Sequence, residues 1–148
     1  MKQCVHCFGV KSNKMQSTCK DQVTDKFLFV IQRVELAIER TADVEHCDDL
    51  LHTPDGADLF DATCMRIQTI GETLKQIDTE TKSRLLVDYP EIPWRKVFAM
   101  RNIISHEYLS VDPQIITDIV KHNLPTLLVV LRRIMEDLNA GKLDAIFG

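Results

Sequence analysis

The feature that most constrains the fold is a helical hydrophobic period that recurs along most of the chain. A first apolar stripe contains Val23, Phe27, Val30, Ile31, Val34, Ala37 and Ile38, and it predicts a helix from Asp21 to about His46. A second follows the segment 52–56 and contains Phe60, Thr63, Ile67, Ile70, Leu74 and Ile77. No segment shows the two-residue alternation typical of a strand. The pattern predicts long amphipathic helices joined by short loops.

Proline, glycine and aspartate positions divide the second half of the chain. We expect a short helix around residues 82–87 and a longer helix that begins near Pro93, whose missing N–H has no partner in a first turn. Asp112 is the expected N-cap of the next helix. Pro125 should kink or break the last apolar stretch, and Gly141 should end it.

Length and composition indicate one globular domain. The chain has 148 residues, of which 45% are hydrophobic and 27% charged, with only five glycines and five prolines. We therefore predict an all-α bundle of four to five main helices over residues 21–148. Residues 1–20 have no clear period and are expected to be a flexible N-terminal arm.

Gly71 interrupts the second stripe, where a glycine lowers helix stability by up to about 1 kcal/mol. A glycine on a buried stripe permits another backbone to approach closely. We therefore expect a neighbouring helix to pack against Gly71.

The charge pattern excludes a protein that coats nucleic acid non-specifically. The net charge is −4, and residues 1–20 hold four lysines and no acid, so residues 21–148 carry 14 basic and 22 acidic residues, a net charge of −8. RNA contacts in the main body would therefore need a local basic patch.

The five cysteines are odd in number, and the start of the chain shows no secretory hydrophobic region, so we expect reduced thiols and a cytoplasmic protein. No apolar run approaches 18 residues, so we expect no membrane span. Cys4, His6 and Cys7 form a C-x-x-C segment that either binds zinc or belongs to a loose tail. The second interpretation is favoured, so no metal or cofactor is expected.

The most informative segment is Arg101-Asn-Ile-Ile-Ser-His106-Glu-Tyr108. A histidine suits proton transfer near neutral pH, and an arginine fork suits phosphate oxygens. At 100° per residue, Asn102 and His106 share a helix face, whereas Arg101 and His106 lie about 140° apart. Three solutions remain open: Arg101 bends round the helix, the helix loosens near Ser105, or a two-fold dimer brings two copies together.

This segment and its flanks resemble the HepT-like ribonuclease toxins of the HEPN superfamily. The family signature Arg-x4-His-x-Tyr is intact, and further similarity lies in Ile70-Gly71-Glu72, Ile92-Pro93-Trp94-Arg95 and Val111-Asp112-Pro113. The resemblance covers about residues 21–140. It implies a helical HEPN fold, a two-fold homodimer and a minimal nucleotidyltransferase as partner antitoxin.

The resemblance also implies an activity, namely metal-independent RNA cleavage through 2′-OH attack, which leaves a 2′,3′-cyclic phosphate and a 5′-OH. His106 would transfer protons, Arg101 would stabilise the added negative charge, and Asn102 would orient the phosphate or the His106 ring. Tyr108 is the residue to which the partner would attach AMP, as a regulatory switch.

Several alternatives stay open at this stage. Arg101 and His106 are otherwise solvated residues at a helix end, and Tyr108 otherwise packs there. Glu72 either forms a salt bridge with Arg101 or Arg95 or lines the cleft. Trp94 is interpreted as a packing anchor rather than a base-stacking platform. The alternative function is a non-catalytic helical binding subunit of a nucleotidyltransferase complex, which the acidic charge favours.

Overall fold

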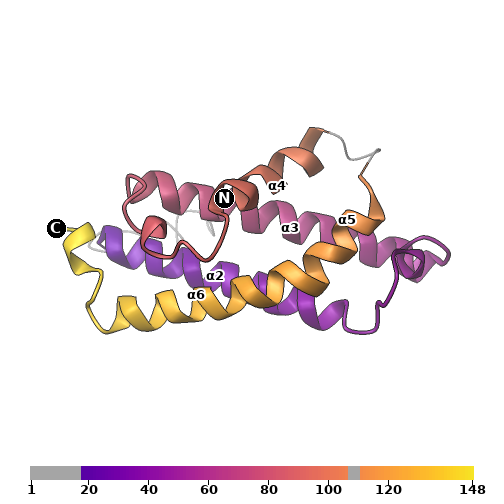
Figure 1. Ribbon diagram of the computed structural model, residues 1–148, viewed down its shortest axis with the longest axis horizontal. Helices are drawn as coiled ribbons and strands as arrows, with labels where there is room; N and C mark the ends of the chain where they lie inside the picture. Colours follow the sequence, from indigo (N-terminus) through magenta and orange to yellow (C-terminus); the bar gives the residue numbers. More distant parts are fainter. Residues whose placement is uncertain (1–17, 107–110) are drawn as a thin grey trace, which may run out of the picture.

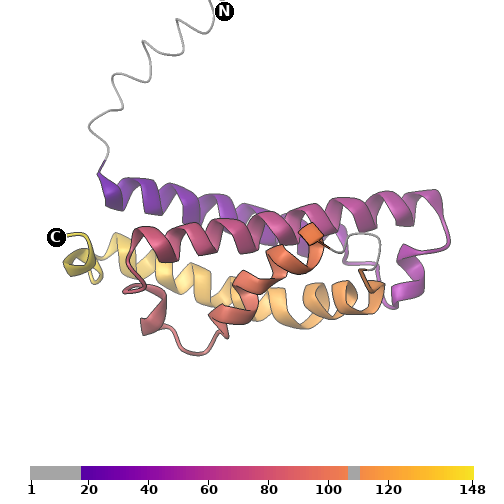
Figure 2. The same cartoon turned by 90° about the horizontal axis from the view of Figure 1, so that it is seen from above.

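A computed structural model describes residues 18–106 and 111–148, and in this part of the chain every regular element is a helix. Three long helices lie side by side along the molecule, and a fourth crosses over one of them (Figures 1 and 2). The main helices are α2 (Cys19–Arg40), α3 (Pro54–Glu80), α4 (Trp94–His106), α5 (Pro113–Asp118) and α6 (Leu124–Asn139). The predicted all-α bundle is confirmed.

The first helix begins and ends earlier than its apolar stripe suggested. Thr18 and Asp21 form a capping box at the start of α2, each side chain accepting a hydrogen bond from the other's backbone N–H. The expected extension to His46 is wrong. The Thr41 hydroxyl donates to the Ala37 carbonyl over 2.7 Å, and the buried side chain of Val44 draws the chain back to the core.

The second long helix begins inside the Pro–Gly segment 52–56, earlier than the apolar stripe that follows this segment. Thr53 is the N-cap and accepts a 2.9 Å hydrogen bond from the Gly56 N–H, while Pro54 occupies the first turn, where its missing N–H costs nothing. The helix therefore runs for 27 residues, from Pro54 to Glu80.

The prediction of a short helix around residues 82–87 is wrong. Lys82 and Ser83 adopt left-handed φ values of 54° and 58°, and the Ser83 N–H caps α3 by donating to the Asp78 carbonyl over 2.8 Å. Only a 3₁₀ turn, Leu86–Asp88, follows. Residues 82 and 83 serve as the end of α3 and so cannot start a new helix.

The last two helices follow the predicted signals. The Asp112 carboxylate accepts from the Gln114 N–H, and Gly141, at φ 78°, ends α6. Pro125 is accommodated by a π-helical turn, Ile119–Asn123, which joins α5 to α6 without a break. The wider turn suits a proline that lacks an N–H and crowds the preceding turn.

One continuous hydrophobic core lies among α2, α3 and α6, and its largest fully buried side chains include Phe27, Ile67, Leu74, Leu131 and Ile134. These residues belong to the apolar stripes on which the helices were predicted. Among the helices that the structure describes, none is long and apolar enough to cross a membrane.

Candidate active site

The motif helix α4 is positioned by direct backbone contact with α3. A Cβ atom built on Gly71 would lie 2.9 Å from the Val97 carbonyl oxygen and 3.3 Å from the backbone nitrogen of Arg101. Any side chain at this position would therefore push α4 away. The expected close approach at Gly71 is confirmed, and the backbone it approaches is that of Val97 and of Arg101 in the motif.

The loop that leads into α4 is fixed to α6. The Tyr89 hydroxyl donates a 2.6 Å hydrogen bond to Asp137, and the Arg133 guanidinium lies 5.2 Å from the Tyr89 ring centre. Burial, followed by the bond to Asp137, raises the pKa of Tyr89 above its usual range. The Trp94 indole N–H donates to the Tyr89 carbonyl over 2.8 Å, and Trp94 packs against the core. Trp94 is therefore a packing anchor.

Arg101 of α4 forms a salt bridge with Glu72 of α3. Its Nη1 lies 3.4 Å from Glu72 Oε2, with 33% of the Arg101 side chain and 50% of the Glu72 side chain exposed. Of the two salt-bridge partners considered for Glu72, the structure thus shows Arg101. An exposed pair at this distance stabilises the fold by less than about 1 kcal/mol. The salt bridge orients the guanidinium at the surface, and its contribution to the free energy is small.

The other motif residues are described only in part. Asn102 is exposed on α4, and His106 is the last residue of that helix. The backbone of α4 is helical through His106, and residues 107–110 lie outside the described residues, so a loosening near Ser105 stays a prediction. The side chain of His106 and all of Tyr108 lie outside the described residues, as do Cys4 and Cys7. The approach of Arg101 to His106 stays a prediction.

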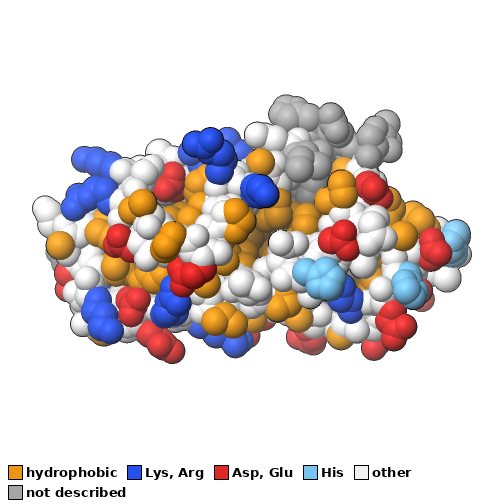
Figure 3. Space-filling model, viewed as in Figure 1, with side chains coloured by type: hydrophobic (Ala, Val, Ile, Leu, Met, Phe, Trp, Pro, Cys, Tyr) orange, Lys and Arg blue, Asp and Glu red, His pale blue; other side chains and the backbone are white. Residues whose placement is uncertain are grey.

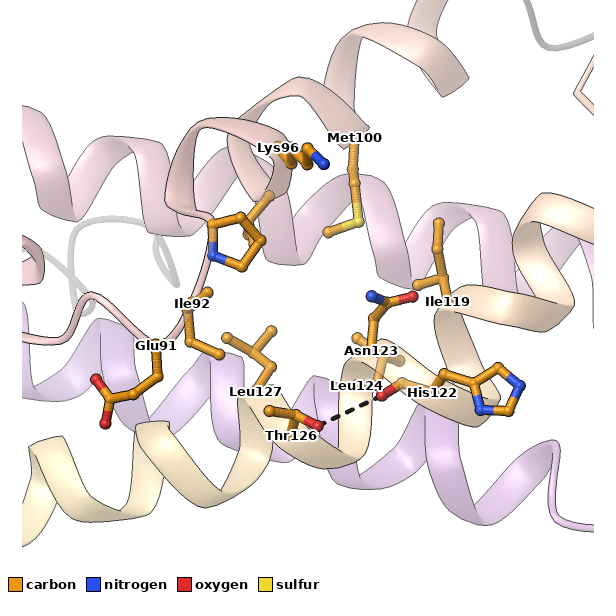
Figure 4. Close-up of a pocket in the computed structure, with 12 residues that line it drawn as sticks. Glu91, Ile92, Lys96, Met100, Ile119, His122, Asn123, Leu124, Thr126 and Leu127 are labelled. Atoms are coloured by element: carbon orange, nitrogen blue, oxygen red, sulfur yellow. Dashed lines mark hydrogen bonds between the residues drawn. The ribbon is translucent and has the colours of Figure 1, made fainter.

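A pocket of about 410 Å³ separates α4 from the π-helical turn and α6. In Figure 3 it is the hollow with hydrophobic side chains at its floor, between α4 and α6. Figure 4 shows Lys96 and Met100 of α4 above it, while Asn123 points into it from the π-helical turn and His122 points away. Lys96 and Asn123 carry no clear sequence signal of a site, because the pocket depends on the π-helical turn.

Among the described residues, the other reactive side chains form no second catalytic site. Burial raises the pKa of the Cys64 thiol to about 11, so it carries no nucleophilic thiolate at neutral pH. His46, His52 and His122 are exposed, as expected of surface residues. Among the residues that the structure describes, no group of three or more histidine, cysteine or acidic side chains is placed to hold a metal ion.

Comparison with known proteins decides the family. The model of the family described as "Ribonuclease HepT-like" matches residues 32–134, a segment that contains α3, α4 and the whole Arg-x4-His-x-Tyr motif. The chain belongs to the HepT-like ribonuclease family. The all-helical bundle agrees with the HEPN-type fold expected of this family.

Curated relatives carry names consistent with this family. A probable ribonuclease HepT of Thermococcus cleftensis is 33% identical over 76% of this chain and 92% of the relative. A gamma-glutamylcyclotransferase and putative RNase of Methanocaldococcus jannaschii is 32% identical over the same share of this chain, which spans only 47% of that larger relative. A putative RNase of Caldanaerobacter subterraneus is 25% identical over 72% of the chain and 88% of the relative. No solved structure matches the chain.

Proposed function

We propose that this HepT-like chain is a metal-independent endoribonuclease and the toxin of a toxin–antitoxin pair, acting on RNA in the cytoplasm. The observation that carries the proposal is the position of Arg101. Gly71 holds its backbone against α3, and Glu72 holds its guanidinium at the surface through a weak ion pair. An RNA phosphate can replace such a carboxylate, because a guanidinium binds both through the same forked geometry.

The proposed reaction is an attack of the RNA 2′-OH on the adjacent phosphorus. The 2′-oxygen bonds to phosphorus as the bond to the 5′-oxygen breaks, giving a 2′,3′-cyclic phosphate and a 5′-OH. His106 takes the 2′-OH proton or delivers a proton to the leaving 5′-oxygen, as suits a group that titrates near neutral pH. Arg101 offsets the negative charge that builds up on the phosphorane, and Asn102 orients the phosphate or the His106 ring.

Single substitutions test the reaction. Purified protein should cleave single-stranded RNA in the presence of EDTA, and Arg101→Ala or His106→Ala should each lower the rate at least about 100-fold, because each removes a group that acts in the transition state. Arg95→Ala is the matched control, since Arg95 is an exposed arginine on the same helix. Wild-type rates in both motif variants would show a contaminating nuclease, and strict dependence on Mg²⁺ would refute the mechanism.

We also propose a two-fold homodimer whose interface contains residues 101–108. It is supported by the regular helical geometry of α4 through His106, which leaves Arg101 and His106 on different faces of one helix. Light scattering at micromolar concentration should give twice the chain mass, and a monomer would contradict the proposal.

The proposed partner is a minimal nucleotidyltransferase antitoxin that attaches AMP to Tyr108. The added phosphodiester carries a charge of about −1 and would compete with RNA for Arg101. Incubation with the partner and ATP should add the mass of AMP to wild-type protein and not to Tyr108→Phe. A mass gain that persists in Tyr108→Phe, or undiminished RNA cleavage by the modified protein, would refute this switch.

A second candidate is a non-catalytic binding subunit of a nucleotidyltransferase complex. The net charge of −8 over residues 21–148 favours it, because RNA is a polyanion. Unchanged RNA together with stable partner binding would support this alternative over the enzyme.

A further inference from the structure

Helices α2 and α3 run side by side and antiparallel (Figure 2). Two rows of mostly charged side chains, one on each helix, face each other along this contact. Both rows repeat every seven residues, which places their members on one side of each helix. The row on α2 is Lys26, Arg33 and Arg40, and the row opposite it on α3 is Glu80, Thr73 and Arg66. At the first level the lysine and glutamate form a salt bridge. At the next two levels the acid is replaced first by threonine and then by arginine.

The result is a cluster of three arginines, Arg33, Arg40 and Arg66, which we call the seam cluster. Within residues 18–106 and 111–148, none of the three forms an ion pair with an acid. Nη1 of Arg66 is buried and has no hydrogen-bond partner in the same part of the chain. Burial, then the charges of Arg40 and Arg33, lower the pKa of Arg66. A surface of this kind attracts negative ligands.

An aromatic side chain extends the seam cluster. Phe29 is 37% exposed, and the Arg33 guanidinium lies 4.9 Å from its ring centre. Aromatic rings and guanidinium planes are the surfaces on which unpaired RNA bases stack. The combination of unpaired positive charge with an exposed ring fits single-stranded RNA better than an acidic peptide.

The surface continues from Phe29 to the motif arginine. The lining of one shallow depression includes Phe29, Thr73 and Gln76, and the lining of a second includes Gln76 and Arg101. Each depression also has one acid and one lysine at its edge, Asp25 and Lys26 in the first and Glu80 and Lys75 in the second. From Gln76 to Arg66 the rise along α3 is about 15 Å. A single RNA strand covers this distance with a few nucleotides.

We propose that the seam cluster and Phe29 bind the phosphate backbone and a base of one RNA strand, a few nucleotides from the bond cleaved at Arg101. This inference rests on the proposed ribonuclease function and adds a substrate-binding surface to it. It also supplies the local basic patch that an acidic chain needs in order to hold RNA.

The test measures binding without cleavage. Single-stranded RNA of 12 nucleotides with every 2′-OH methylated has no nucleophile, so its affinity is independent of catalysis. Fluorescence anisotropy over a range of salt concentrations would compare the wild type with Arg40→Gln/Arg66→Gln. The matched control is Arg84→Gln/Arg132→Gln, which removes the same charge from arginines that already have partners: carbonyls of residues 145 and 146 for Arg84, and Glu35 for Arg132.

The seam variant should bind RNA at least about tenfold more weakly. The slope of log Kd against log salt should fall by about 0.7 for each lost phosphate contact. The control should stay within about twofold of wild type. Equal weakening in both variants would overturn the proposal, because it would show only the effect of net charge. Wild-type RNA affinity in the seam variant, with loss of binding to the nucleotidyltransferase, would instead assign the cluster to a protein partner.

Cleavable RNA separates this proposal from the proposed function. With a 12-nucleotide substrate, the seam variant should raise KM about tenfold and leave kcat nearly unchanged, whereas Arg101→Ala lowers kcat. If the wild type binds methylated RNA through the cluster but cuts no RNA, the proposed function fails and the binding surface stands. If the wild type cuts RNA and the seam variant has an unchanged KM, the binding surface fails alone.

Discussion

The two sides of α3 pack against their neighbouring helices in different ways. Toward α4, contact is set by backbone geometry: Gly71 admits the α4 main chain, and the charge nearest that contact, Arg101, lies beside Glu72. Toward α2, contact is set by side chains repeating every seven residues, and only the Lys26–Glu80 level has matched charges. The α4 side of α3 fixes the position of Arg101. On the α2 side, the arginines of the seam cluster form no ion pair with an acid among the described residues.

Some arginines elsewhere do have acidic partners, so the lack of such pairs in the seam cluster is not shared by every arginine. On α6, Arg132 pairs with Glu35 of α2, and Arg133 pairs with Glu91. The bond to Glu91 raises the pKa of Arg133, whereas burial and neighbouring arginines lower the pKa of Arg66. Among the described residues, acids are paired with Arg132 and Arg133 but none is paired with an arginine of the seam cluster. Local conflicts of this kind concentrate at functional surfaces.

The largest effect should come from filling the α4 side of α3. Gly71→Val places a Cβ where the Val97 carbonyl lies 2.9 Å away, and this backbone atom cannot rotate aside as a side chain can. We expect a loss of about 3 kcal/mol in the free energy of unfolding, since overpacking typically costs 1–3 kcal/mol and here displaces a helix. Urea unfolding measures it, and RNA cleavage should fall as well because Arg101 moves with α4.

The matched control is Thr73→Val, which introduces the same residue two positions along α3 but on its α2 side. Thr73 and valine have similar volumes, so the free energy of unfolding should change by less than about 1 kcal/mol. Equal destabilisation by the two variants would mean that the α3–α4 contact is no tighter than the α2–α3 contact.

Local sequence signals predicted most of the helices and one of the contacts. The apolar stripes gave α2 and α3, Asp112 gave the start of α5, and Gly71 gave the close approach of a helix. Each of these depends on residues that act within one or two turns. The motif likewise located Arg101, because the family signature is contiguous in sequence.

Features that depend on competition or on helix register were missed. The helix expected at residues 82–87 does not form, because Lys82 and Ser83 adopt left-handed conformations that cap α3. The salt bridge of Glu72 could not be assigned between Arg95 and Arg101 until α4 was placed. The seam cluster needs the register of α2 against α3, although the sevenfold spacing of Lys26, Arg33 and Arg40 was already visible in the sequence.

A smaller effect of opposite sign should come from the α2 side of α3. Arg66→Met keeps an unbranched side chain and good helix propensity. It removes a buried donor that has no partner among the described residues, and it removes the repulsion of this charge by Arg40 and Arg33. We expect the free energy of unfolding to rise by about 1 kcal/mol, the typical scale of one unsatisfied buried polar group. Thermal unfolding should show a melting temperature higher by about 2–4 °C.

Salt distinguishes the cause of this stabilisation. Added salt screens repulsion between like charges, so moderate salt should stabilise the wild type and have a smaller effect on Arg66→Met. Arg132→Met is the control, because it breaks an exposed pair and should leave stability unchanged or slightly lower. A lower melting temperature for Arg66→Met would mean that its guanidinium stabilises the folded chain. If Arg66 serves RNA binding, Arg66→Met should be more stable and should bind RNA more weakly. Replacing an arginine with a purely structural role would lower stability instead.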